Sequence, residues 1–104
     1  MNCLGLACRN QAYVRGITLR FHFQFEESNS VIEEQRIELL DVDAAKCRAM
    51  QIMSDIICER PHKFWETETC RLVVSDRDGL ILFAVDMVAT IAPAYTSYAR
   101  RSAA

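Results

Sequence analysis

The side chains best suited to chemistry are five cysteines and two histidines, which could act as metal ligands, redox groups or nucleophiles. The cysteines are odd in number and have no tight repeated spacing: Cys3, Cys8, Cys47, Cys58 and Cys70. A structural zinc site normally takes four ligands in recognisable pairs, and only Cys58, His62 and Cys70 approximate such a set. We therefore predict no metal site and expect reduced thiols.

Three other polar residues could be mistaken for catalytic groups. No serine, cysteine or carboxylate is tied to His22 by a motif, so we interpret this histidine as a surface residue. Asp76 and Asp78 precede Gly79, and turn chemistry explains both aspartates without a calcium ion. The chain also has no glycine-rich phosphate loop and no GxSxG elbow. We predict no catalytic, cofactor-binding or metal-binding residue, and expect that the protein is not an enzyme.

The net charge and the hydropathy of the chain limit the classes of binding partner that we expect. A net charge of −2 gives no general attraction to nucleic acid or to an anionic membrane, so nucleic acid is not a favoured partner. No apolar run reaches the roughly 18 to 20 residues that cross a bilayer. With 104 residues, of which 51% are hydrophobic, the chain is expected to form one soluble, cytoplasmic domain.

One amphipathic helix from Asp41 to Glu59 positions the rest of the chain. Its apolar residues recur at helical spacing: Val42, Ala45, Ala49, Ile52, Met53, Ile56 and Ile57. Its opposite side carries Ala44, Cys47, Arg48, Gln51, Asp55 and Cys58 among others. Asp41 is a suitable N-cap, and Pro61 cannot continue the helix. At a rise of ~1.5 Å per residue, Cys47 and Cys58 are about 16 Å apart, which excludes a disulfide between them.

Two strand pairs flank this helix. Residues 18–25 alternate aromatic and polar side chains, which predicts a strand whose phenylalanine face meets the helix. The chain returns through residues 31–39, where charges at 33–36 leave open a bulge or a second turn. The segments 67–75 and 80–88, joined through Gly79, predict a second hairpin.

These elements predict an α+β fold, a ββαββ antiparallel sheet with one amphipathic helix packed on one face. We divide the chain into a loosely ordered N-terminal extension (1–17), a single domain (18–88) and a flexible C-terminal tail (89–104). Between the helix and the second hairpin, residues 60–66 are interpreted as a linker. Its Phe64 and Trp65 are expected to plug the end of the core, with ligand stacking as the alternative.

Three segments are similar to an uncharacterised bacterial family of short domains. They are Arg20-Phe21-His22-Phe23, the Ile37 to Asp41 helix start leading to Ala44, Ala45 and Ala49, and Val74 to Gly79 with the apolar strand that follows. The resemblance covers roughly residues 19–87 and implies a small ββαββ domain without an established activity. The chain departs from the family at Glu33 to Arg36, where an Asp-x-x-Gly turn is usual, and at Leu40, where proline is usual.

Apolar residues on both faces of the last strand bear on function. Leu80, Leu82 and Ala84 are expected on one face, and Ile81, Phe83, Val85 and Met87 on the other. One helix covers one face, so the N-terminal segment, the tail or a second copy must cover the other. We expect a non-catalytic protein-interaction or regulatory module that forms a homo-oligomer or binds a protein through the sheet face opposite the helix. The alternative is a nucleic-acid-linked regulator of the antitoxin type, because the hairpin followed by an acidic helix cap is loosely similar to the antitoxin half of small bacterial toxin and antitoxin pairs. Separately, Tyr95, Tyr98 and the two arginines of the tail are residue types that could contact RNA by stacking and charge.

Overall fold

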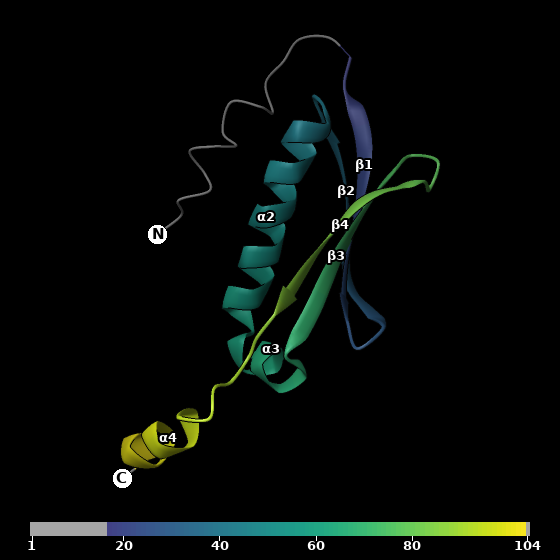
Figure 1. Cartoon of the computed structure of the whole chain (residues 1–104). Helices are drawn as coiled ribbons and strands as arrows, with labels where there is room; N and C mark the ends of the chain where they lie inside the picture. Colours follow the sequence, from purple (N-terminus) through teal and green to yellow (C-terminus); the bar gives the residue numbers. More distant parts are fainter. Residues whose placement is uncertain (1–16, 104) are drawn as a thin grey trace.

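In a computed structural model, which describes residues 17–103, two β-hairpins enclose a helical segment (Figure 1). The elements are β1 (Leu19–Glu27), β2 (Ser30–Leu39), α2 (Val42–Glu59), α3 (Pro61–Thr67), β3 (Thr69–Asp76), β4 (Ile81–Val88) and α4 (Tyr95–Ala103). The strands form one antiparallel sheet in the order β2-β1-β3-β4, so the predicted α+β fold with the helix on one face is confirmed. The predicted extension at 1–17 lies, apart from its last residue, outside the described residues.

The first hairpin turns tightly at Ser28 and Asn29. Both residues have positive φ, 50° and 64°, as a two-residue hairpin turn with the right-handed twist of its strands requires. Strand β2 is continuous, and Ile32 is its extra residue, since Phe25 pairs with Glu33 while Glu26 pairs with Val31. Of the two possibilities left open for residues 33–36, the structure therefore contains the bulge.

The second hairpin is held by Asp76. Its Oδ1 accepts hydrogen bonds from the N–H groups of Asp78 and Leu80, both at 2.9 Å. Gly79 has φ of +89°, a conformation that costs glycine no steric strain. The predicted hairpin is confirmed, with both aspartates in the turn.

The core lies between helix α2 and the sheet. Asp41 caps the helix, its Oδ1 accepting from Ala44 N–H at 2.8 Å. The largest fully buried side chains are Phe21, Phe23, Phe25, Met53, Leu72 and Val74. The predicted apolar side of the helix is confirmed at Ala45, Ala49, Ile52, Met53 and Ile56. The prediction is wrong at the first turn, where Ala44 is buried and Val42 is 40% exposed. Val42 is exposed because it is the first residue of the helix and has neighbours on one side only.

Residues interpreted as a linker form helix α3. Pro61 ends α2 and begins α3, since a helix needs no N–H from its first residue. Phe64 is buried and plugs the core as expected. Trp65 does not, because it is 52% exposed and meets Phe64 only edge-on, at 6.0 Å between ring centroids.

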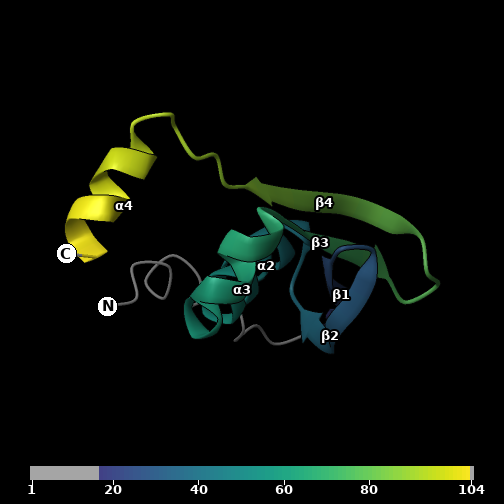
Figure 2. The same ribbon diagram turned by 90° about the horizontal axis from the view of Figure 1, so that it is seen from below.

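Helix α4 was not predicted from the sequence, which indicated a tail. It follows β4 through residues 89–94 and lies apart from the sheet in both views (Figures 1 and 2). Tyr95 and Tyr98 are exposed, and the Arg101 guanidinium lies 5.1 Å from the centre of the Tyr98 ring. Within the described residues no helix is long and apolar enough to span a membrane.

Candidate interaction surface

Strand β4 forms one rim of the sheet and receives the least cover. Helix α2 contacts β1, β2 and β3 more than it contacts β4. Figure 2 shows β4 along the upper rim, with α2 and α3 beside the other strands and α4 set apart from the sheet. Phe83, Val85 and Met87 point to the helix side, yet each is only partly buried. The incomplete cover follows from sheet geometry, because strands lie about 4.8 Å apart and one helix, about 10 Å wide, cannot span four of them.

The opposite face of the sheet is polar over β1 and β2. Arg20 Nη2 lies 3.3 Å from Glu38 Oε2. His22 Nε2 lies 2.8 Å from Glu34 Oε1. These cross-strand pairs account for His22 as a surface residue of the sheet. The apolar part of the face opposite the helix is therefore narrower than the whole sheet, and consists of exposed residues of β4 together with Val73 of β3, which pairs with Ala84.

We call the exposed apolar residues of β4 and of Leu80, which precedes it, the β4 strip; Asp86 interrupts it, and its members are Leu80, Ile81, Leu82, Ala84 and Val88. Leu80, Ile81 and Val88 are each about two-thirds exposed, at 65%, 64% and 65%. Ile81 was expected to lie on the same face as Phe83, Val85 and Met87. It does not, because Ser75 pairs with Ile81 while Val74 pairs with Phe83, so the strand carries an extra residue at Leu82 and the alternation breaks there.

Every second residue of β4 has its backbone N–H and C=O groups pointing away from β3, toward the free edge of the sheet. Ala89 N–H donates to Glu68 C=O at 2.8 Å, so Ala89 points toward β3. Backbone groups alternate along an antiparallel strand, which places those of Ala84, Asp86 and Val88 on the free side. Since β4 ends the strand order, no described strand accepts these groups. An open edge of this kind is the usual site of strand addition.

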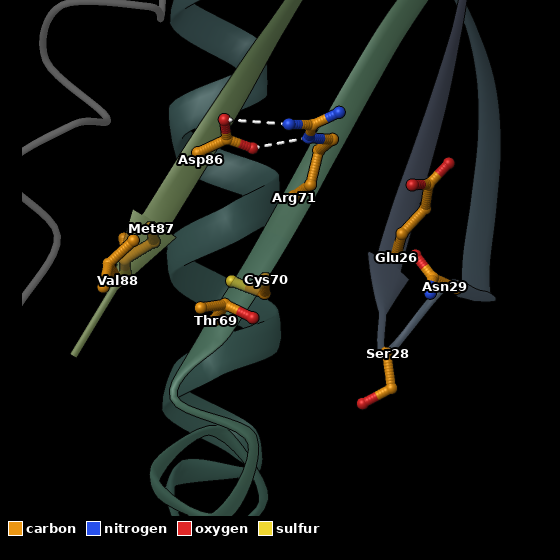
Figure 3. Close-up of a pocket in the computed structure, with 9 residues that line it drawn as sticks. All are labelled: Glu26, Ser28, Asn29, Thr69, Cys70, Arg71, Asp86, Met87 and Val88. Carbon is orange, nitrogen blue, oxygen red and sulfur yellow. Dashed lines mark hydrogen bonds and ion pairs between the residues drawn. The ribbon is translucent and has the colours of Figure 1, made fainter.

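A shallow hollow of about 510 Å³ adjoins the strip (Figure 3). Arg71 and Asp86 point toward one another across it, with Nε to Oδ1 at 2.6 Å and Nη2 to Oδ2 at 3.1 Å. The hydrogen bonds from Arg71 lower the pKa of Asp86, and those to Asp86 raise the pKa of Arg71. Because both charged groups are engaged with each other, the hollow presents no free cation for an anionic ligand.

The three residues considered as metal ligands, Cys58, His62 and Cys70, lie in different parts of the structure. Cys70 is buried on the helix side of β3, whereas Cys58 and His62 are exposed on α2 and α3. Burial, with Glu27 and Asp86 nearby, raises the pKa of the Cys70 thiol to about 11, which makes it a poor nucleophile. Among residues 17–103, no three histidine, cysteine or acidic side chains form a group that could hold a metal ion.

The expectation of reduced thiols has a mixed outcome. Cys58 and Cys70 are free. Cys47 is disulfide-bonded, so the expectation is wrong for this residue. Cys3 and Cys8 lie outside the described residues.

A second hollow of about 590 Å³ lies between α3 and the segment leading into α4. Trp65, Ile91 and Tyr95 supply its apolar wall, and His62, Glu66 and Thr90 its polar part. Sequence reasoning did not find this hollow, because it depends on the path of residues 90–95. It is open to solvent, unlike the enclosed pockets that bury most of the surface of a small ligand.

A family model described as a domain of unknown function (DUF6894) matches residues 20–89. The match begins in β1 and runs to the residue after β4, which leaves α4 outside it. No curated protein and no solved structure matches the chain.

Proposed function

The chain belongs to the DUF6894 family of domains of unknown function, and we propose that it is a non-catalytic protein-interaction module that binds a partner strand along β4. The observation that carries this proposal is the coincidence of an open backbone edge with the β4 strip. Backbone hydrogen bonds along such an edge supply affinity, and the flanking apolar side chains supply specificity.

A comparison of the two rims supports the choice of β4. Soluble proteins protect edge strands with charged residues, proline or a covering element. Strand β2 follows this rule, with Glu33, Glu34, Arg36 and Glu38 along its length. Strand β4 has no proline, and its one charged residue, Asp86, is already paired with Arg71. Strand addition at β4 therefore desolvates little unpaired charge.

The test compares the tagged full chain with its Ala84→Pro variant in co-purification from the native host, read by quantitative mass spectrometry. Proline at 84 removes an N–H that points to the free side, so it blocks strand addition and leaves the β3–β4 ladder intact. The tagged parent is expected to retain a partner protein, which can be another copy of this chain, and the Ala84→Pro variant is expected to lose that partner.

The matched control is Ile32→Asp in the other rim strand, where the side chain is 43% exposed, close to the 39% of Leu82. Leu82→Asp should lose the same protein as Ala84→Pro, whereas Ile32→Asp should retain it. Circular dichroism confirms that each variant is folded. Equal retention by the parent, Ala84→Pro and Leu82→Asp would show that β4 is not the binding element.

The alternative, a nucleic-acid-linked regulator, is supported by helix α4 alone. Its last turn has Arg100 and Arg101, and Tyr95 and Tyr98 are exposed for base stacking. The same co-purified samples distinguish the two functions. Nucleic acid that is retained by the parent and by Ala84→Pro, but lost from an Arg100→Ala and Arg101→Ala double variant, would favour the alternative.

A further inference from the structure

Resting on the proposed function, we infer that the strand bound by β4 is β4 of a second copy of this chain, antiparallel to the first, with Val85 on the two-fold axis. The two sheets then join into one, with both α2 helices on the same face. Three features of β4 determine this arrangement: the alternation of its side chains, the extra residue at Leu82 and the position of Asp86.

The alternation limits the possible registers. Paired residues of an antiparallel ladder point to the same face, so an axis perpendicular to the sheet must pass through a residue and not between two. Any other alignment would place Phe83, Val85 and Met87 of one copy against the outer face of its partner. The candidate centres within the regular part of the strand are therefore Ala84, Val85 and Asp86.

Two of these centres are unfavourable. A centre at Ala84 pairs the irregular segment at Ile81 and Leu82 with the partner's regular strand, which interrupts the ladder. A centre at Asp86 sets like charges directly opposite one another. A centre at Val85 pairs the regular segment from Phe83 to Met87 with itself, so the irregular Leu82 falls only at the end of the ladder, and no like charges lie directly opposite one another.

The Val85 register is also self-complementary. On the helix side Phe83 lies opposite the partner's Met87, and Val85 opposite the partner's Val85, which extends the core layer across the junction. On the other face Leu82 lies opposite the partner's Val88, and Ala84 opposite the partner's Asp86. The free backbone groups of Ala84 and Asp86 meet their counterparts and form a hydrogen-bonded pair on each side of the axis. The β4 strip thus fits a second copy of itself, which is the reason for naming that occupant.

The experiment is disulfide trapping of the purified full chain with Cys58 replaced by serine, because Cys58 is the exposed free thiol among the described residues. Val85 lies at a non-hydrogen-bonded position toward the partner, where Cα atoms are about 4.5 Å apart and a disulfide can form. Val85→Cys should give a reductant-sensitive dimer on mild oxidation, in severalfold higher yield than Phe83→Cys, whose counterpart is Met87. Light scattering should give twice the chain mass for the parent and the single-chain mass for Ala84→Pro.

Specific outcomes would overturn the inference. A parent that stays monomeric at high micromolar concentration, with no excess trapping at Val85→Cys, excludes the β4 pair. Preferential trapping at Ala84→Cys would instead place the axis at Ala84. Since the purified chain is used alone, a monomer that still co-purifies with a different protein in an Ala84-dependent way would overturn this inference and leave the proposed function standing.

Discussion

Arg60 Nη2 lies 3.3 Å from Glu27 Oε1, and the Glu27 side chain is only 4% exposed. Glu27 is the last residue of β1, whereas Arg60 lies at the junction of α2 and α3. The ion pair therefore ties the far end of the first hairpin to the end of the helix. Burial raises the pKa of the Cys70 thiol on β3, and the nearby Glu27 charge raises it further.

Removing Arg60 should be costly. Arg60→Ala leaves a buried carboxylate without its cation, and we expect the free energy of unfolding to fall by about 1 to 3 kcal/mol. Glu27→Gln should cost less, because the amide is neutral. Urea denaturation measures both, with Arg20→Ala at the exposed Arg20–Glu38 pair as the control, where little change is expected. A loss in Arg60→Ala no larger than in the control would contradict a structural role for the pair.

The buried side of helix α2 should dominate stability. Ile56 is 6% exposed, and Ile56→Ala should lower the unfolding free energy by about 2 to 5 kcal/mol through lost burial and a residual cavity. Met50 is 39% exposed on the same helix, so Met50→Ala removes apolar volume with a much smaller effect. Thermal melting checks the difference. Equal melting temperatures would show that the helix packs on another side.

The Cys70 thiol should make stability fall at alkaline pH. Its pKa is raised from an ordinary 9.0 to about 11 in the folded chain, so the unfolded chain loses the proton first. The stabilising contribution is complete below pH 9 and is lost as the pH rises through about 11. Urea midpoints between pH 8 and 11 measure this fall, and Cys70→Val should reduce the pH dependence. An unchanged slope in Cys70→Val would assign the fall to other groups.

Asp76 should hold the second hairpin through its carboxylate oxygen. Asp76→Ala removes the acceptor of two backbone hydrogen bonds, and we expect a loss of about 1 to 3 kcal/mol. Asp76→Asn keeps an oxygen acceptor and should retain most of the stability. Chemical denaturation distinguishes the two variants. An equal loss in both would indicate that the charge, and not the acceptor geometry, holds the turn.

Much of the fold could be predicted from the sequence because its signals are local. The phenylalanine alternation in β1, the Asp41 cap and the turn before Gly79 each depend on neighbours within a few residues, and each has the predicted structure. The same is true of the apolar side of α2 beyond its first turn. Periodicity also placed His22 on the exposed face, and the structure adds the identity of its partner, Glu34.

Other features were decided by tertiary structure. The break in alternation that exposes Ile81 depends on how β4 pairs with Val74 and Ser75, because a bulge is a property of two strands. The ion pair between Glu27 and Arg60 joins residues 33 positions apart. Above all, periodicity predicts which side of a helix is apolar, but not which strands the helix will cover. Helix α2 lies mainly over β1, β2 and β3, and this lateral position, fixed only by the packed core, is what leaves β4 open.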